Sequence, residues 1–535
     1  MAGDEQSARI QLGTGAKVVV VGLDGATWVN LLPLVERGAM PFLGGLLETG
    51  GHGVLESTLP CVTPPAWGSF VTGTSPARHG VLDFTERMDS DTFSFVSFKN
   101  LAVPKLWDVL THCRRRSVFL GIPFTYPPEP LNGIFVPGPP IPRQEGLATH
   151  PPELAAEIAA RIPGYTPELR YGKRSEILDE IYRATRNRRE LAQWLMSFEE
   201  WDFFMVTFIA PDRLHHKLWH KEKIVAEYYR HLDEVLAALL EGLDRSTYVI
   251  FMSDHGFTSM RTKFFPNQWL ASRGYLKARF VRRSREQNAR TLMPTPRRQR
   301  SAGKVYGWRR PLRCLPGWKD AGWIIDRAGT QAFASFGHFP GVFVNLRGRY
   351  EGGSVAPGAE YEEVRESLIR DLETIIDPGT GQPLFKRVAR REELFDGDHL
   401  ERMPDVISEV SDPAVRLRSN LGLGRFFVDF DKPKSYHAPD GIVLVKGPGI
   451  AAGRRIEGCV IQDVAPLVLY LMGLPRLSTM DGRLPRGFFN DDFEGWKREE
   501  VVIDAAETGF VPGAHTFSEA EQEKIGRQLE ALGYY

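Results

Sequence analysis

Acidic and imidazole side chains occur in four groups along the chain, each beside a short apolar run, and they are the residues best suited to hold metal ions. The groups are Asp24, Asp212 with His216, Asp254 with His255, and His437. Carboxylate and imidazole are ligands that Zn²⁺ or Mn²⁺ takes in proteins, and three Asp with three His would furnish two metal sites. Each group alone has an ordinary explanation, such as a turn former or a helix cap. Their joint occurrence favours a two-metal centre.

Thr63 supplies a candidate nucleophile for such a centre. It lies in a turn bracketed by prolines, Leu59–Trp67, at the expected start of a helix. A free hydroxyl is a poor nucleophile near neutral pH, and a bound dication is one way to lower its pKa. The N-terminus of the helix behind it would also help to hold a phosphate. A simpler interpretation makes Thr63 the N-cap of that helix, and Cys61 is a rival nucleophile that has no flanking base.

Short apolar runs alternate with longer helical patterns, which favours an α/β fold with a largely parallel sheet. The expected strands, rich in Val, Ile and Phe, are Lys17–Leu23, Ser117–Ile122, Phe203–Phe208, Tyr248–Met252 and Ile442–Val445. The expected helices are Glu153–Arg161, Arg174–Ser197, Lys223–Leu243 and Tyr361–Ile376, and a capping-box pattern at Ser518–Glu521 precedes a final helix. In an open α/β sheet, ligands gather beyond the carboxyl ends of the strands. Three of the four groups are therefore expected to converge there, while the fourth, with His437, must arrive on a loop.

The chain is expected to divide into a core interrupted by insertions. The expected segments are a first part of the core at 15–270, a basic insertion or cap at 271–335, a subdomain at 336–415, a second part of the core with the last metal ligand at 416–485, and a C-terminal extension at 486–535. The stretch from Lys277 to Arg313 holds 13 Lys or Arg and one acid, Glu286. It could steer an anionic substrate or bind a polyanion such as RNA or lipid headgroups. A solvated loop is the simpler interpretation, and we favour it.

The bulk composition points to an ordinary globular protein. The 535 residues have a formal net charge of zero, so no overall field argues for nucleic acid or a membrane as partner. No apolar run approaches the roughly 20 residues of a membrane-spanning helix, and the N-terminus does not resemble a signal peptide. The four Cys residues lack CxxC spacing, which indicates neither a disulfide framework nor a cysteine–metal site. We therefore expect a cytoplasmic location and a small-molecule partner.

The order of several motifs resembles the alkaline phosphatase superfamily, in the branch of type I phosphodiesterase/nucleotide pyrophosphatase-like proteins. The matching stretches are Val20–Gly25, Thr63–Pro65 with Thr72-Gly73 and Arg78–Gly80, Pro211–His216, Ser253–Gly256, His437–Gly441, Asp463–Pro466, Met472–Pro475, Met480–Gly482 and Leu532–Tyr534. They span nearly the whole chain. The resemblance implies an α/β fold with an alkaline phosphatase-like central sheet, mostly parallel and flanked by helices, with an inserted cap or subdomain.

The same resemblance implies the roles of the candidate residues. One metal would be held by Asp24, Thr63, Asp254 and His255, and the other by Asp212, His216 and His437. Both ions are usually zinc in such proteins, about 4 Å apart as in other two-metal sites, although Mn²⁺ or another divalent ion is also compatible. Thr63 would attack phosphorus and form a phospho-threonine intermediate. The spacing of the Asp-x-x-x-His motif makes His216 the ligand and leaves His215 a structural role.

One residue departs from the family pattern and limits the substrate. Nucleotide pyrophosphatases carry an Asn shortly after the His-Gly turn that binds a phosphate oxygen, whereas Phe84 stands there in this chain. Nucleotides are therefore not assigned as substrates. Thr63 in place of a Cys-x-Pro-x-Arg motif also argues against a sulfatase. The expected activity is hydrolysis of phosphate mono- or diesters, with phosphomutase or phosphotransferase activity as the alternative and a non-catalytic, metal-stabilised binding protein as a further one.

Overall fold

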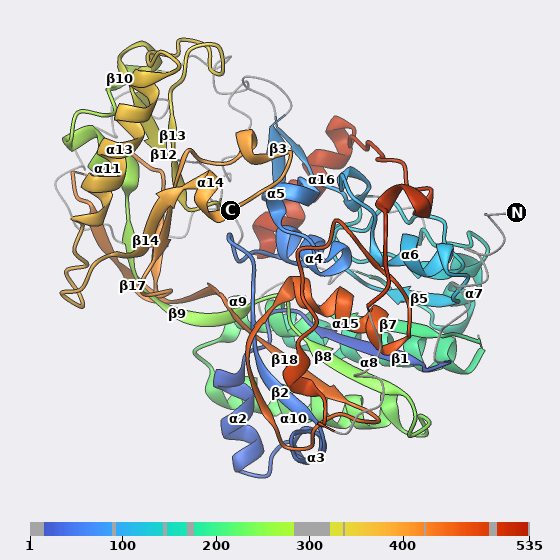
Figure 1. The fold of residues 1–535 in the computed structure, drawn as a ribbon. Coiled ribbons are helices and arrows are strands. Elements are labelled where there is room, and N and C mark those ends of the chain that lie inside the picture. Colours follow the sequence, from blue (N-terminus) through green and yellow to red (C-terminus); the bar gives the residue numbers. More distant parts are fainter. Residues whose placement is uncertain are drawn as a thin grey trace, which may run out of the picture.

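The centre of the fold is an eight-stranded sheet with the strand order β19-β2-β18-β8-β1-β7-β5-β6 (Figure 1). The computed structural model describes residues 15–87, 93–142, 147–167, 176–198, 200–282, 321–334, 338–421, 424–491 and 500–532. The strands of the sheet are β1 (Val18–Leu23), β2 (Gly51–Glu56), β5 (Ser117–Leu120), β6 (Gly133–Val136), β7 (Phe203–Phe208), β8 (Tyr248–Met252), β18 (Asp440–Lys446) and β19 (Arg455–Val460). Only β18 runs against the others in this sheet. The expected mostly parallel α/β sheet is confirmed.

The apolar runs of the sequence became central strands because both faces of this sheet are covered. All six residues of β1 are buried, as expected for a parallel strand between two helical layers. Successive side chains of a strand point to opposite faces. Val18 and Val20 accordingly belong to one hydrophobic cluster, and Val19 and Val21 belong to the other. Strands β7 and β8 have the predicted bounds.

Helices form the two covering layers, which lie below and above the sheet in the view of Figure 1. One layer contains α2 (Trp28–Glu36), α3 (Pro41–Thr49), α7 (Leu154–Arg161), α8 (Ile177–Phe198), α9 (Ala210–Leu218) and α10 (Glu222–Leu240). The other contains α4 (Thr63–Thr72), α6 (Leu106–His112), α15 (Val464–Leu471) and α16 (Glu519–Leu532). The predicted capping box is present: the Ser518 backbone N–H donates to the Glu521 carboxylate at 3.0 Å, and the Glu521 backbone N–H donates to Ser518 Oγ at 3.4 Å.

A smaller unit lies beside the core at the upper left of Figure 1. A three-stranded sheet of β9 (Gly256–Phe264), β16 (Val415–Leu417) and β17 (Phe427–Ala438) joins the two parts. The unit itself contains the four-stranded sheet of β12 (Ala332–Ala334), β13 (Gly341–Val344), β14 (Phe385–Arg390) and β15 (Val406–Val410), with α11 (Pro266–Ser272) and α13 (Ala359–Glu373). These elements share one hydrophobic cluster. The expected segments 271–335 and 336–415 thus contribute strands to the same sheet.

The basic stretch lies largely outside the described residues. Its flanks form a two-stranded sheet of β10 (Ala278–Arg282) and β11 (Ala321–Ile325), and residues 283–320 between them are not described. Its role stays a prediction.

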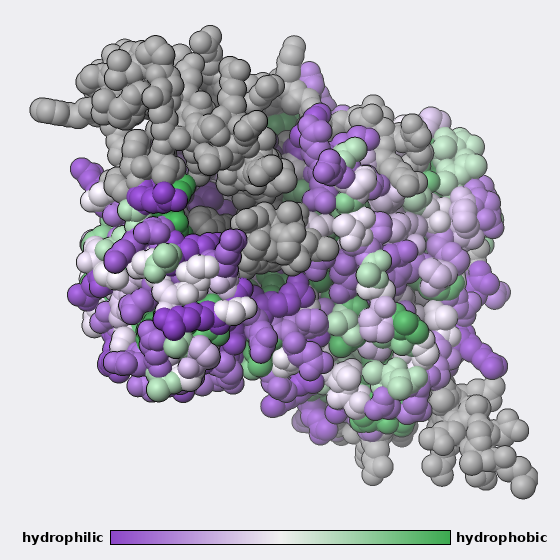
Figure 2. Space-filling model, turned by 90° about the horizontal axis from the view of Figure 1, so that it is seen from above, coloured by the Kyte–Doolittle hydropathy of each residue, from purple (hydrophilic) through white to green (hydrophobic). Residues whose placement is uncertain are grey.

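Short elements complete the fold. They are α5 (Pro76–His79), α14 (Arg391–Leu394), β3 (Thr85–Arg87), β4 (Phe93–Phe95), β20 (Arg476–Leu477), β21 (Val502–Ile503) and the 3-10 turns Phe98–Asn100, Arg327–Gly329, Leu400–Arg402, Ile461–Asp463, Arg486–Phe488 and Ala505–Thr508. On the face shown in Figure 2, hydrophilic and hydrophobic residues are interspersed among the coloured atoms. Within the described ranges, none of the helices combines the length and apolar character needed to cross a bilayer.

Candidate metal centre

Three of the four Asp and His groups meet at one edge of the central sheet, as predicted. β8, β1 and β7 are parallel neighbours, so their carboxyl ends share that edge. Asp24 directly follows β1, and Asp254 with His255 follows β8 after Ser253. Asp212 lies in the first turn of α9, which begins two residues after β7 ends. The Asp24 N–H donates to the Phe208 carbonyl at 3.0 Å, which links the ends of β1 and β7.

His437 reaches the same edge on a strand, so the expectation of a loop was wrong. It is the penultimate residue of β17, where it lies opposite Phe257 of β9 in an antiparallel pair. Because β18 runs against β8, the start of β18 and the residues just before it lie at the carboxyl end of β8. The sequence hid this strand because only two of the twelve residues of β17 are buried and it lacks an apolar run.

The first group of candidate ligands consists of Asp212, His216 and His437. His216 Nε2 lies 3.0 Å from His437 Nε2, and Asp212 Oδ1 lies 3.3 and 3.4 Å from these two nitrogens. Metal–nitrogen bonds of about 2.0–2.1 Å in a tetrahedral zinc site place neighbouring ligand atoms about 3.3–3.4 Å apart. His437 Nδ1–H donates to the Cys61 carbonyl at 3.2 Å, which turns Nε2 toward the other two side chains. The spacing of the group fits one metal ion.

The second group consists of Asp24, Asp254 and His255. His255 Nε2 lies 3.3 Å from Asp254 Oδ2 and 3.9 Å from Asp24 Oδ1. His255 Nδ1–H donates to the Gly256 carbonyl at 3.1 Å, so Nε2 is the atom that faces the carboxylates. Asp24 Oδ1 and Asp254 Oδ2 are buried, and neither accepts a hydrogen bond from the residues that the structure describes. Buried carboxylate oxygens in this state are suited to a cation.

The electrostatics of the two groups differ. Burial, reinforced by the Asp254 and Asp212 carboxylates, raises the pKa of Asp24 well above its usual range. Burial and the Asp212 charge likewise raise the pKa of Asp254. Burial would also raise the pKa of Asp212, but the His216 and His437 side chains hold it well below its usual range. Burial lowers the pKa of His255 to about 4. The imidazoles are therefore neutral near pH 7, the form that binds metal ions.

Thr63 is the first residue of α4, and the N-cap of this helix is Val62. The interpretation of Thr63 as the N-cap was therefore wrong. Its Oγ1 lies 3.5 Å from His255 Nε2, which places the hydroxyl beside the second group. Pro64 and Pro65 follow it and have no N–H to donate. The expected support of a phosphate by this helix N-terminus is consequently limited to the helix dipole and few amides.

Cys61, the rival nucleophile, is placed differently. Its carbonyl holds His437, as described above, and burial raises the pKa of its thiol to about 12. The thiolate is the nucleophilic form of cysteine. The structure therefore favours Thr63 over Cys61.

Several residues that position the candidate ligands were not foreseen from the sequence. Trp67 Nε1–H donates to Asp24 Oδ2 at 3.4 Å, and the Gly25 N–H donates to Asp254 Oδ1 at 3.1 Å. Gly25 has φ +68°, and a Cβ there would lie 3.2 Å from the Asp212 Cα, so this position requires glycine. The Asp24-Gly25 pair was the feature of the sequence that could have indicated this close approach. His215 Nδ1–H donates to the Gly25 carbonyl at 3.1 Å, which gives it the structural place expected.

Three large aromatic side chains of the first part of the core lie in its interior. Trp67, Phe84 and Trp107 are all buried in one hydrophobic cluster. Phe84 packs edge-on against Phe124 and His338, with ring centroids 5.6 and 5.2 Å away.

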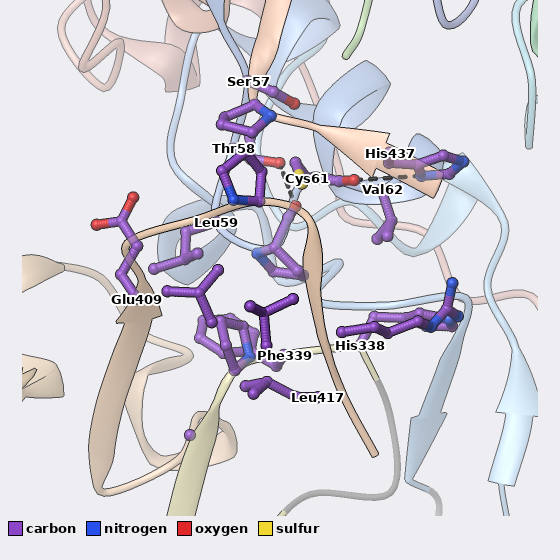
Figure 3. Close-up of a pocket in the computed structure, with 18 of the residues that line it drawn as sticks. Ser57, Thr58, Leu59, Cys61, Val62, His338, Phe339, Glu409, Leu417 and His437 are labelled. Carbon is purple, nitrogen blue, oxygen red and sulfur yellow. Dashed lines mark hydrogen bonds between the residues drawn. The ribbon is translucent and has the colours of Figure 1, made fainter. Parts of the chain in front are cut away.

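A cavity of about 710 Å³ opens beside His437, between the core and the smaller unit. Figure 3 shows Cys61, Val62 and His437 on one wall and Phe339 and Leu417 on the opposite wall. A cavity of this size accommodates a small organic molecule. Its walls mix apolar and polar residues, and they include His437 of the first group and Val62, which precedes Thr63 in the chain. The cavity is therefore a candidate substrate pocket.

Solved structures share this fold over most of the chain. Human ectonucleotide pyrophosphatase/phosphodiesterase 5 is 14% identical with a TM-score of 0.51, and the match covers 89% of this chain and 100% of that one. Its murine counterpart, an inactive form in complex with AMP, is 14% identical with a TM-score of 0.50 over 89% of this chain and 100% of that one. Phosphonoacetate hydrolase from Sinorhizobium meliloti, in complex with phosphonoformate, is 15% identical with a TM-score of 0.52 over 86% and 95%. The alkaline phosphatase-like architecture expected from the sequence is thereby confirmed.

The comparison with curated proteins gave no significant match. The family model of type I phosphodiesterase / nucleotide pyrophosphatase, by contrast, matches residues 18–436. That range contains β1, Thr63 and nearly all the candidate ligands, and it ends one residue before His437. The expected enzyme class, a phosphate-ester hydrolase, is confirmed with it. The chain belongs to the type I phosphodiesterase / nucleotide pyrophosphatase family.

Proposed function

We propose that this protein is a metal-dependent phosphohydrolase that cleaves phosphate mono- or diesters through a phospho-threonine at Thr63. One observation carries the proposal: five distant chain segments bring six candidate metal-binding side chains and one hydroxyl to a single edge of the sheet. Within each of the two groups, the candidate ligand atoms all lie within 4.8 Å of one another. Structural ion pairs rarely gather three buried Asp and three buried or nearly buried His in one place.

Asp24, Asp254, His255 and Thr63 would hold one divalent ion, and Asp212, His216 and His437 would hold the other. The buried Asp24 and Asp254 oxygens support this division, because each needs a positive partner. Mixed carboxylate and imidazole ligands suit zinc best, and Mn²⁺ is the alternative. Two bound dications would lower the pKa of the Thr63 hydroxyl and offset negative charge on the phosphoryl oxygens.

The protein's own residues then carry out a two-step displacement. Thr63 Oγ1 releases its proton to solvent and forms a bond to phosphorus, while the P–O bond on the opposite side breaks. The leaving oxygen keeps the electron pair of that bond and takes up a proton from solvent. Water subsequently cleaves the phospho-threonine ester and restores the hydroxyl. Trp67 holds Asp24 in place, and the Cys61 carbonyl holds His437. The cavity of about 710 Å³ beside His437 would hold the alcohol portion of the ester.

The substrate we propose is a small phosphate ester. Two of the similar structures carry small phosphorus-containing anions, AMP and phosphonoformate. The cavity beside His437 has room for molecules of this size. Phe84 stands at the position of the Asn of nucleotide pyrophosphatases, but it is buried in the core and has no polar side-chain atom to bind a phosphate oxygen. We therefore do not extend the proposal to nucleotides.

The decisive experiment compares p-nitrophenyl phosphate with bis-p-nitrophenyl phosphate as substrates. The purified protein is stripped with a chelator, then reconstituted with Zn²⁺ or Mn²⁺, and its metal content is assayed beside kcat/KM. Turnover that disappears on stripping and returns with about two ions per chain is expected. Bound metal without turnover of either ester would instead indicate a binding protein. Transfer of labelled phosphate to an added alcohol, in preference to water, would indicate a phosphotransferase.

A further inference from the structure

Two arginines line the cavity from the side of the smaller unit. Arg416 lies in β16 and Arg418 follows just after its end, and both contribute to the wall of the cavity that His437 also lines. Side chains two residues apart in an extended segment point to the same face. The Arg418 N–H donates to the Phe264 carbonyl at 2.8 Å, which fixes the backbone of this segment to the end of β9. Both side chains are half-buried.

These arginines differ from the other cations of the same cavity. Lys386 and Arg387 both pair with the Glu409 carboxylate, at 2.7 and 2.8 Å. Among the described residues, by contrast, neither Arg416 nor Arg418 forms an ion pair with a carboxylate. Neighbouring arginines do, as in Arg261 with Asp412 and Arg387 with Glu409. Partly buried guanidinium groups usually have an anionic partner. The cavity therefore contains positive charge that the described side chains do not neutralise.

The two arginines also lie close to the candidate metal centre. The Arg416 guanidinium lies 3.2 Å from the ring centroid of Tyr436. Tyr436 in turn stacks on His437, with ring centroids 4.5 Å apart and an angle of 12° between the rings. A single aromatic ring thus separates the guanidinium from a candidate ligand. Burial and the adjacent charge of Arg416 lower the pKa of Arg418 to about 10, which an anion in the cavity would reverse.

We propose that Arg416 and Arg418 form a subsite for a second anionic group, carried by the alcohol portion of the phosphate ester. The inference rests on the proposed function and narrows its substrate class to esters of acidic alcohols. A guanidinium presents paired N–H donors that match the two oxygens of a carboxylate or a phosphate. The phosphoryl group would lie toward His437 and the candidate metal centre, and the second anion would lie beside Tyr436 in the cavity.

The test compares two aryl esters that differ in one charge. The substrates are 4-nitrophenyl phosphate and 3-carboxy-4-nitrophenyl phosphate, each also prepared as its ethyl diester, and kcat/KM is measured for each at low and at high salt. Arg418→Gln is the test variant, since Arg416 also supports Tyr436. Arg387→Gln is the matched control, because it removes the same charge from the same cavity but from a residue that already pairs with Glu409.

The wild type is expected to prefer the carboxylated ester about tenfold, since a charge-assisted hydrogen bond contributes at least that factor. Arg418→Gln should abolish the preference for the carboxylated ester over 4-nitrophenyl phosphate, and Arg387→Gln should retain it. Equal preference in the wild type and Arg418→Gln would overturn the subsite, as would an equal loss in Arg387→Gln, which would indicate a diffuse charge effect. No turnover of any ester by the metal-loaded wild type would instead contradict the proposed function, and the subsite with it.

Discussion

His216 Nε2 and His437 Nε2 lie 3.0 Å apart although 221 residues separate them in the chain. Both nitrogens also face Asp212 Oδ1, at 3.3 and 3.4 Å. His216 belongs to α9 in the core, whereas His437 arrives on β17, which leads back from the smaller unit. An ion bound by these three atoms would therefore connect β17, and the strand β9 paired with it, to α9 of the core. Because Tyr436 and His437 of β17 line the cavity, binding of that ion would also influence the shape of the cavity.

Replacing Thr63 with Ala should abolish turnover and leave metal content nearly unchanged. Thr63 is one of four proposed ligands of one ion, while Asp24, Asp254 and His255 remain. We expect kcat to fall by at least about a thousandfold, because loss of a nucleophile leaves only binding and electrostatic effects. Cys61→Ala is the matched control and should keep kcat/KM within about threefold, since its thiol is protonated at neutral pH. Inactivation by Cys61→Ala with an active Thr63→Ala would reverse the assignment.

Removal of metal should lower the thermal stability of the protein. Burial of the Asp24 and Asp254 carboxylates without a cation is unfavourable, which their raised pKa values express. An ion present at about a hundred times its Kd stabilises the folded state by about 2.7 kcal/mol. Calorimetry of stripped and reconstituted protein should show a midpoint several degrees higher with Zn²⁺. Asp254→Asn should lose most of that rise, and an unchanged midpoint in the wild type would contradict metal binding.

Trp67→Phe should weaken metal binding, whereas Trp107→Phe should not. Both indoles are buried in the same hydrophobic cluster. Trp67 Nε1–H donates to Asp24 Oδ2 at 3.4 Å, while Trp107 Nε1–H donates to Glu129 at 2.9 Å, away from the candidate ligands. Loss of a hydrogen bond that orients a metal ligand typically costs 10–100-fold in affinity, so we expect about a tenfold rise in metal Kd for Trp67→Phe. Competition with a chromophoric chelator measures it, and equal effects in the two variants would refute the positioning role.

Stability should fall as the pH drops below about 6.5, partly because of His79. Burial lowers the pKa of His79 to about 3, and its Nδ1 accepts the Val81 N–H at 3.2 Å, which only the neutral ring allows. The unfolded chain takes up a proton below about pH 6.5 and the folded chain does not, so this contribution is complete above that pH and is lost on acidification toward about pH 3.

The slope attributable to one such histidine is at most about 1.4 kcal/mol per pH unit. Urea unfolding of the wild type and of His79→Asn between pH 7.5 and 5.5 isolates it, because the other buried imidazoles titrate in both proteins. The variant should lose stability less steeply with falling pH than the wild type. Parallel slopes would show that His79 does not remain neutral in the folded state.

The sequence by itself determined the central strands and the chemistry at their ends. Continuous Val, Ile and Phe runs predicted β1, β7 and β8 because a strand buried on both faces must be apolar throughout. The Asp and His residues that follow these runs then had to share one edge of a parallel sheet. Side-chain types predicted which atoms would bind metal and which hydroxyl would attack, and both stay predictions.

Only the tertiary structure decided how the remaining parts reach that edge. Most residues of β17 are exposed or half-buried and carry no periodic apolar signal, so nothing local showed that His437 would lie on a strand. The hydrogen bond from Trp67 to Asp24 joins residues 43 positions apart. Arg418, which follows β16, lines the same cavity as His437. These contacts depend on how strands pair and units pack over long separations, whereas composition and periodicity record only what each segment does on its own.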